Sequence, residues 1–449
     1  MSCQFLPGSK IFENKYSFDG KEWCFFHLPM KDLNGNESQK NTIKLEKINV
    51  FYEILYKWIE GKLRRGEKYI DFSYMVFPIG LDEIFYSISQ EISGDLVIKL
   101  NNCQIFGDSA IYTVEKLNLS IDMIGAEFFS YVWFNRAIFT SSRFEKTIFH
   151  NTVTFSSCKF SNCTFSDAKF FQHSSFYSSL LNKSDFYNCE FYDDVDFLNS
   201  SLEYDNSFHN VIFHGNTCFA TMSEANSDKE FGEIDFRSSE FGHVEFTNRK
   251  FLDKTDFTDC TFKKAPLFHG CTFHQFTIFP ERERFKDTSS DYAVSAYRTL
   301  ALAMSNIKAR NEEGMFYSLY QESLKNSKKI KSVDLFVSTC YKIFSNYGQS
   351  IARPIGFLFL TFLTSWIIYC IRLSPIVSLN KKIDWGIAAK SLHIAFLQIV
   401  KPFSIMSVLK QYSLQSDGIV TLVSNIQSLL SLIFIALLVL AIRWKFKRD

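Results

Sequence analysis

Large apolar residues, nearly all phenylalanine, recur every five positions between about Phe129 and Phe279. Single-residue slips separate the regular blocks, and Leu181 and Leu202 stand where a phenylalanine is missing. A period of five matches neither the 3.6 residues of a helix nor the two of a strand, so the pattern indicates a structural repeat. The phenylalanines expected in the repeat core include Phe134, Phe139, Phe144, Phe155, Phe160, Phe165, Phe170, Phe186, Phe191, Phe236, Phe241, Phe246 and Phe257.

A second column of residues accompanies the first. Two positions before most of the large residues stands a small or β-branched one, such as Ala137, Ser142 or Cys158. One large and one small inward residue, with polar residues between them, describe one flat side of a narrow coil. Four such sides would close a turn of about 20 residues. Parallel strand hydrogen bonds, roughly 4.8 Å apart, would join the stacked turns.

Units such as Cys158-Lys-Phe160, Ala168-Lys-Phe170 and Ser184-Asp-Phe186 resemble the repeat unit of the pentapeptide-repeat proteins. The resemblance implies a mainly β fold, a right-handed quadrilateral parallel β-helix, over residues 70–280. This chain departs from the family by using phenylalanine almost everywhere and by inserting one residue every two to four units. These insertions predict departures from a regular square coil.

The regular repeats occupy residues 126–280, and looser spacing over 70–125 predicts degenerate opening coils. Within the N-terminal segment, residues 1–69, apolar positions at helical spacing from Leu45 to Arg65 predict an amphipathic helix. A β-helix ends in unpaired strands, so this helix is interpreted as a cap; docking of a partner protein is the alternative. The polar interval 220–230 predicts a loop that projects from one edge.

Residues 281–350 are expected to form a helical connector. Ser289 or Ser290 would cap a helix that extends to about Ala309, and a second helix would cover residues 312–325. The stretch resembles the connector of membrane-attached pentapeptide-repeat proteins. Lysines near residues 325–342, beside apolar residues of an amphipathic segment, suit an anionic membrane surface.

Residues 351–449 are expected to form a membrane domain. Two apolar stretches, residues 354–373 and 422–442, are long enough to cross a bilayer, and 383–412 predicts a re-entrant or interfacial segment. This arrangement resembles the two-span ion-channel module, which occurs fused to pentapeptide repeats, although the potassium-channel filter sequence is absent. Uncharged polar residues of the second span could line a pore or hold helices together. These candidates are Ser424, Asn425, Gln427, Ser428 and Ser431.

Charge and leader sequence change this picture little. The chain carries 49 basic and 48 acidic residues, so no general affinity for polyanions is indicated and we expect no nucleic-acid partner. No secretory signal opens the sequence. Basic residues flank both spans, and two spans place both ends on one side. The sequence therefore predicts a multi-pass protein of the bacterial inner membrane with cytoplasmic N- and C-termini.

No catalytic, cofactor or metal site is predicted, and the chain is not expected to be an enzyme. Five of the eleven cysteines fall in the small inward column (Cys158, Cys163, Cys189, Cys260 and Cys271), where cysteine acts as a small hydrophobe. Five of the nine histidines directly follow a central phenylalanine and should point outward (His150, His209, His214, His269 and His274). An acidic surface patch is expected from Asp185, Glu190, Asp193, Asp194, Asp196, Glu203 and Asp205.

The leading hypothesis is a cytoplasmic β-helix that acts as sensor or docking platform for a homo-oligomeric, channel-like membrane module. A protein partner would bind the β-helix, and membrane lipids would surround the spans. Two alternatives remain open. One is a membrane-tethered scaffold that does not conduct, and the other is an effector of bacterial anti-phage defence that permeabilises the membrane.

Overall fold

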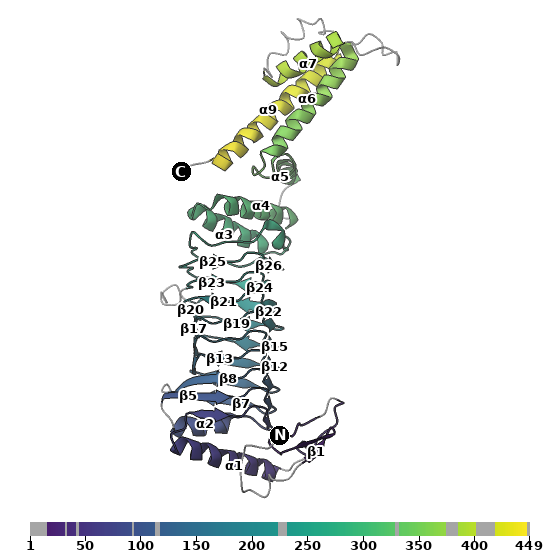
Figure 1. Cartoon of the computed structure of the whole chain (residues 1–449). Helices are drawn as coiled ribbons and strands as arrows, with labels where there is room; N and C mark the ends of the chain where they lie inside the picture. Colours follow the sequence, from purple (N-terminus) through teal and green to yellow (C-terminus); the bar gives the residue numbers. More distant parts are fainter. Residues whose placement is uncertain are drawn as a thin grey trace. The chain divides into compact units, whose positions relative to one another are not determined.

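The structure, a computed structural model, describes residues 16–31, 34–41, 45–91, 94–112, 117–222, 231–327, 332–373, 385–400 and 418–446. The chain forms two compact units, Met1–Ser323 and Leu324–Asp449. The first is a β-solenoid with helices at its two ends, and the second is helical (Figure 1).

The solenoid has four sides, each a ladder of parallel strands. One side consists of β4 (Val76–Phe77), β6 (Gln104–Ile105), β9 (Glu127–Phe128), β12 (Ile148–Phe149), β15 (Lys169–Phe170), β18 (Glu190–Phe191), β22 (Ile212–Cys218), β24 (Glu240–Glu245) and β26 (Thr261–Phe262). The next consists of β7 (Ser109–Tyr112), β10 (Val132–Asn135), β13 (Val153–Ser156), β16 (Ser174–Ser175) and β19 (Val195–Asp196), and it continues into the later parts of β22 and β24.

The third side consists of β3 (Tyr69–Asp71), β5 (Gly94–Lys99), β8 (Leu117–Asp122), β11 (Ile138–Thr140), β14 (Lys159–Ser161), β17 (Leu180–Asn182) and β20 (Ser201–Leu202). The fourth begins as single parallel bridges and continues as β21 (Asn206–Ser207), β23 (Ile234–Asp235) and β25 (Thr255–Asp256). The predicted quadrilateral parallel fold is therefore confirmed.

Stacked phenylalanine rings fill the axis, one column per side. Phe144, Phe165 and Phe186 lie face to face, with 4.5 Å between the centroids of neighbouring rings. Rings of adjacent columns meet edge to face, as Phe155 does with Phe165 at 6.1 Å. Both arrangements are favourable for aromatic rings, so each ring contributes to two directions of packing. Leu181 and Leu202 occupy the column of Phe139 and Phe160, as the sequence predicts.

The inserted residues leave most coils in register, and the predicted irregularity is seen as a register shift between Phe213 and Asn216 in the pairing of β22 with β24. Three corners turn through a residue with positive φ two positions after the central phenylalanine, such as Ser157 (55°) and Asn162 (53°). At the fourth corner this residue is missing, and the spacing to the next phenylalanine grows to six, as from Phe170 to Phe176. In the coils up to Phe197 the extra residue recurs at this corner, so Phe134 pairs with Phe155 and the columns stay in register. Later coils also have a spacing of six between the third and fourth sides, from Leu202 to Phe208, from Phe251 to Phe257 and from Phe273 to Phe279.

One coil makes this fourth corner without the extra residue, between Phe241 and Phe246. Gly242 lies there against the preceding coil, where an added Cβ would lie 2.4 Å from the carbonyl oxygen of His214. The shortened corner thus requires glycine, because any side chain would collide with backbone.

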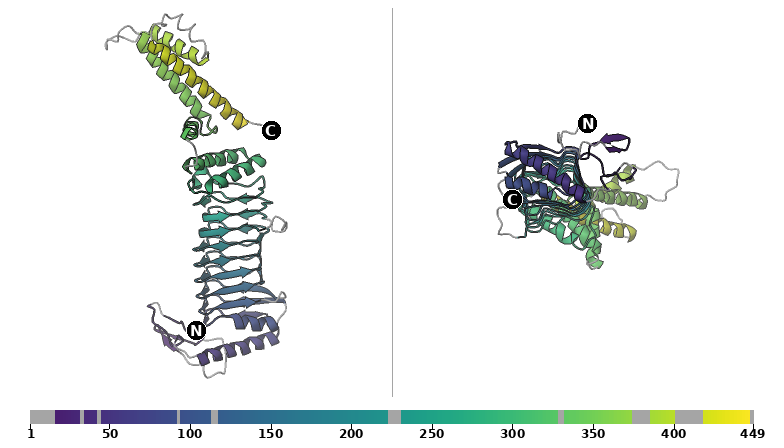
Figure 2. Two further views of the ribbon diagram at one scale, coloured as in Figure 1. Left: turned by 180° about the vertical axis from the view of Figure 1, so that it is seen from behind. Right: turned by 90° about the horizontal axis from the view of Figure 1, so that it is seen from below.

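The N-terminal end carries a hairpin of β1 (Tyr16–Phe18) and β2 (Lys21–Trp23), and two helices, α1 (Leu45–Arg64) and α2 (Asp82–Glu91). α1 corresponds to the expected amphipathic helix, and its Phe51, Leu55 and Ile59 are buried in the solenoid core. Figure 2 (right) shows α1 and α2 lying across the end of the coil. α2 corrects the interpretation of residues 70–125 as coils alone, because Ile84 belongs to a helix.

The C-terminal end of the solenoid is also capped. Its last stacked ring is Phe285, five residues beyond the predicted end, and a short 3-10 helix, η1 (Arg282–Arg284), precedes it. Two helices follow, α3 (Ala293–Asn306) and α4 (Arg310–Asn326). Phe316 of α4 packs edge-on against Phe285 at 5.3 Å, and Tyr297 of α3 donates a hydrogen bond to the carbonyl oxygen of Asp287. Residues expected to act as a connector thus close the open end of the solenoid.

The predicted helix cap at Ser289 or Ser290 is wrong. α3 begins after Tyr292, which makes no side-chain capping bond. The backbone nitrogens of Ser289 and Ser290 instead donate hydrogen bonds of 2.9 and 3.0 Å to the Asp287 carboxylate. This carboxylate also accepts a hydrogen bond from the backbone nitrogen of Ala265, so it ties the start of the cap to the last coils.

The second unit consists of α5 (Ser332–Ser345), α6 (Ala352–Leu373), α7 (Trp385–Val400) and α9 (Gly418–Phe446). α6 and α9 contain the two predicted spans, and α7 covers residues 385–400 of the predicted re-entrant segment; residues 383–384 and 401–412 of that segment lie outside the described residues. The helices pack around Tyr369, Ile394, Ala395 and Val420.

Candidate functional site

The small inward side chains do more than fill space. Cys189, Cys260 and Cys271 each donate a thiol hydrogen bond to a backbone carbonyl of the preceding coil, at 2.8, 2.8 and 3.0 Å. Ser179 and Ser239 do the same with hydroxyl groups. The carbonyl oxygens that the three thiols reach, those of Phe165, Phe236 and Phe246, each also accept a backbone hydrogen bond from three residues further on, so the thiol is an additional donor. Some members of the column therefore add a hydrogen bond, whereas others, such as Ala137 and Val153, contribute volume alone. This refines the interpretation of these cysteines as hydrophobes alone.

One residue in this column is large and charged. Arg249 lies two positions before Phe251, is fully buried, and extends along the solenoid axis. Its Nη1 donates to the carbonyl oxygen of Ser200 at 2.7 Å, its Nη2 to those of Phe197 and Ala220 at 3.2 and 3.1 Å, and its Nε to that of Phe219. Burial lowers the pKa of Arg249 to about 10, so the guanidinium stays charged near neutral pH.

The guanidinium lies where the repeat is interrupted. The coil that contains Phe219 and Phe231 includes residues 223–230, which lie outside the described residues. The ring of Phe231 lies under the guanidinium at 4.5 Å and meets Phe251 at 78° rather than stacking on it. Arg249 thus supplies donors to two preceding coils at once. The sequence holds a signal for this role, an arginine in a column of small residues about one coil after the polar interval.

An aromatic ladder runs along the outside of one corner. It consists of Phe106, Phe129, His150, Phe171, Tyr192 and His214, with neighbouring ring centroids 4.5 to 5.5 Å apart and nearly parallel planes. Each ring directly follows a central residue, so a spacing of 21 to 23 residues could have revealed the ladder. Stacking covers the ring faces and leaves mainly their edges exposed, so the ladder stabilises the coil rather than offering a stacking platform.

The outward histidines do not form a metal site among the described residues, where no group of three His, Cys, Asp or Glu could hold an ion. His209 stacks on Tyr187 and His214 on Tyr192, in separate columns. His269 pairs through Nδ1 with the hydroxyl of Thr299 on α3, at 3.1 Å. These rings take part in surface packing.

The expected acidic patch is not one patch. Asp185 lies on the fourth side, Glu190 on the first, Asp196 on the second, and Glu203 follows the third. A run that is dense in sequence winds around the whole coil, because about 21 residues complete one turn. Several members serve the backbone, as Asp194 does by accepting a hydrogen bond of 2.7 Å from the nitrogen of Asn216.

In the helical unit, four of the five candidate pore residues are buried by the chain's own helices. These are Ser424, Gln427, Ser428 and Ser431, whereas Asn425 is exposed. Tyr369 of α6 donates to Gln427 Oε1 at 3.0 Å, and Gln427 Nε2 donates to the carbonyl oxygen of Ala395 on α7 at 2.9 Å. One glutamine therefore links all three helices. Whether any of these residues lines a pore remains a prediction.

The outer surface of this unit is apolar. Leu422, Leu429 and Val439 of α9 and Phe359 and Ile371 of α6 are all more than half exposed. Within the apolar stretch of α6, only 17% is buried against the rest of the protein, and within that of α9 only 28% is buried. The core helix of a soluble protein would be mostly covered, so the two helices show the reverse arrangement, polar inside and apolar outside.

Four of the six basic residues within 332–373, 385–400 and 418–446 lie at one end of this unit, whereas Arg372 ends α6 and Lys390 lies on α7. α6 and α9 run antiparallel, since Phe357 near the start of α6 stacks on Phe434 in the second half of α9. The start of α6 and the end of α9 therefore belong to the same end of the unit. Arg353 donates to the carbonyl oxygen of Lys342 at the C-terminal end of α5. Arg443 is the first charged residue of α9.

No family model matches the chain, and no curated protein matches it. One of the solved structures that match is HetL, a pentapeptide repeat protein involved in heterocyst differentiation regulation from the cyanobacterium Nostoc sp.. It is 11% identical, the match covers 50% of this chain and 96% of that chain, and the TM-score is 0.25, so the likeness carries nothing about function. The parallel ladders and stacked columns themselves establish a solenoid of pentapeptide repeats, followed by a helical region with two long apolar helices.

Proposed function

We propose that this protein is a membrane-anchored scaffold, in which α6 and α9 cross the bacterial inner membrane and the solenoid binds a protein partner in the cytoplasm. The observation that carries the proposal is the inverted polarity of the helical unit. Its exposed surface is apolar, and its polar side chains bond to one another inside. Hydrocarbon cannot satisfy polar groups, so membrane helices keep them inside in this way.

The basic end supports the orientation. Lys342, Arg353, Arg443 and Lys445 belong to the end at which α6 begins and α9 ends. Basic residues mark the cytoplasmic side of membrane proteins. The solenoid precedes α6 in the chain and is therefore assigned to the same side.

The test is membrane extraction at alkaline pH after expression in bacteria. We expect the full-length protein to stay with the membrane pellet. Leu429→Arg places a charge on the exposed apolar face of α9 and should release a measurable fraction, since arginine in a span costs about 3 kcal/mol. Leu252→Arg, at an exposed leucine of the solenoid, is the matched control and should not change extraction. Complete release of the wild-type protein would refute the proposal.

A second candidate, the oligomeric channel-like module, is favoured by one observation. Gln398 Nε2 and Ser431 Oγ are buried and have no hydrogen-bond partner among the described residues. A polar group buried in hydrocarbon without a partner is costly, so these atoms are candidates to contact water or ions inside an assembly. The test is the oligomeric state in mild detergent together with conductance in planar bilayers. A monomer that passes no current contradicts this candidate and leaves the scaffold standing.

A further inference from the structure

A pocket of about 270 Å³ lies at the basic end of the helical unit. It is lined by Tyr341 of α5, Tyr347 and Gly348 of the following turn, and Leu440, Arg443 and Trp444 of α9. Since a water molecule takes about 30 Å³ of liquid volume, the space corresponds to roughly nine waters. A small polar group fits, and a large cofactor does not.

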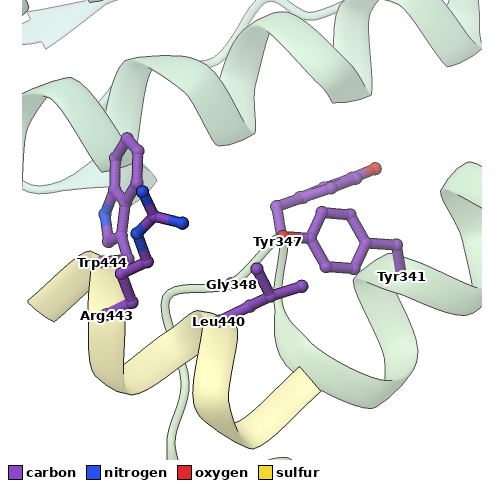
Figure 3. A pocket seen from close by; sticks show the side chains of 6 residues that line it. All are labelled: Tyr341, Tyr347, Gly348, Leu440, Arg443 and Trp444. Atoms are coloured by element: carbon purple, nitrogen blue, oxygen red, sulfur yellow. The ribbon is translucent and has the colours of Figure 1, made fainter. Parts of the chain in front are cut away.

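The pocket is rich in hydrogen-bond donors. Figure 3 shows the Arg443 guanidinium and the Trp444 indole on one side, and the Tyr341 hydroxyl directed toward Gly348 on the other. Among the described residues, the side chains of Arg443 and Trp444 make no hydrogen bond or ion pair, and both side chains can only donate. Tyr347 turns its hydroxyl toward Ser338, at 3.3 Å, and contributes its ring to the wall.

Gly348 keeps the pocket open at its base. Its φ is +85°, and an added Cβ would lie 2.8 Å from the Tyr341 hydroxyl oxygen. A residue with a side chain would therefore strain the turn and press on the phenol. The absence of a side chain here preserves the position of the donor on this side.

The charged residues around the pocket favour an anionic ligand. Arg353, Arg443 and Lys445 lie at this end of the unit, and Asp334, near the far end of α5, is the only acidic residue within 332–373, 385–400 and 418–446. Leu440, half exposed, continues the pocket wall onto the apolar surface of α9. A ligand here would meet donors at one end and hydrocarbon at the other.

We propose that this pocket binds the phosphate group of an anionic phospholipid, with the head group beside Arg443 and Trp444 and the acyl chains along Leu440. The inference rests on the proposed membrane anchoring. Guanidinium groups bind phosphate oxygens through two parallel donors, and tryptophan and tyrosine side chains favour the level of the lipid head groups. Basic pockets between helices at the cytoplasmic side are suited to such lipids.

The experiment is native mass spectrometry of the full-length protein in a neutral detergent, titrated with phosphatidylglycerol or phosphatidylcholine. We expect selective retention of phosphatidylglycerol and roughly tenfold weaker retention in Arg443→Gln, which removes a charge-assisted bidentate donor. Lys445→Gln removes the same charge two residues away, outside the pocket, and should stay within about twofold of wild type, since its contribution is diffuse and exposed. Equal losses in the two variants would show nonspecific surface attraction and overturn the proposal.

Two further measurements distinguish a lipid phosphate from a soluble phosphate ester, and the membrane anchoring from the lipid pocket. Glycerol 3-phosphate, which carries the phosphate without acyl chains, should displace no phosphatidylglycerol at millimolar concentration; efficient displacement would overturn the assignment to a lipid. Alkaline extraction of Arg443→Gln should resemble that of the wild type. Wild-type protein that is released from membranes refutes the anchoring, whereas an anchored protein with no lipid preference refutes only the pocket.

Discussion

Arg249→Met tests whether the buried guanidinium holds the interrupted part of the solenoid together. Methionine has a similar length but cannot donate hydrogen bonds. The carbonyl oxygen of Phe197 would keep the backbone nitrogen of Ser200 as donor, and that of Ala220 would keep the nitrogen of Asn199, both at 3.0 Å. The carbonyl oxygens of Ser200 and Phe219 receive their side-chain hydrogen bond from Arg249 and would lose it.

The magnitude follows from these losses. Each buried acceptor left without a donor costs about 1–3 kcal/mol. Removing the buried charge offsets part of this loss of stability, because the cost of desolvating the guanidinium no longer opposes folding. The net expectation is a loss of about 3 kcal/mol in local stability around residues 197–251.

Hydrogen exchange followed by mass spectrometry on the full-length protein in detergent measures this local stability. A loss of about 3 kcal/mol accelerates exchange by roughly 150-fold in peptides from 197–222 and 231–251. Peptides from 132–176 should not change. Lys250→Met, at the exposed neighbouring residue, removes the same charge and should have no effect. A change below about threefold in Arg249→Met, or an equal change in Lys250→Met, would refute the reasoning.

Three further variants and one labelling experiment test other parts of the structure. Phe155→Ala should cost about 4 kcal/mol by leaving a cavity in the ring stack, whereas Phe160→Leu should cost less than about 1.5 kcal/mol because leucine fills the same column in the next coil; equal shifts in guanidinium denaturation would contradict the stacked core. At pH 8, iodoacetamide should modify Cys340 and spare Cys163, because burial raises the pKa of the Cys163 thiol to about 11; peptide mass spectrometry detects the difference, and equal labelling would count against it. Tyr369→Phe should destabilise the helical unit by about 1 kcal/mol, measured by unfolding in mixed micelles, and an unchanged midpoint would argue against the link to α9.

The caps illustrate why part of the fold escaped prediction. Tyr297 and Phe316 belong to helices that the sequence predicts by local spacing, yet their contact with the last coil depends on Phe285, which no local pattern identifies as the end. Similarly, α2 interrupts a region whose apolar residues, such as Ile84, fit a loose repeat as well as a helix. The spacing of apolar residues identifies a helix, but only the tertiary packing shows which part of the solenoid that helix covers.

The seven acidic residues show the same limit in the candidate site. Asp185 and Glu190 are close in sequence, but one turn of the coil distributes such a run over all four sides. The polar residues of α9 are a second case. Their positions in a span predict an inward face, but whether that face meets α6, α7 or another copy depends on contacts such as that between Tyr369 and Gln427, 58 residues apart.

The sequence alone determines the solenoid, because its period of five and its paired columns of large and small residues are repeated locally in every coil. It also determines the two apolar helices, because length and composition suffice. Tertiary structure decides the rest. Arg249 reaches carbonyls up to 52 residues away, and the donors of the Arg443 pocket come from segments about a hundred residues apart. Such relations arise from distances across the folded chain, which no local spacing encodes.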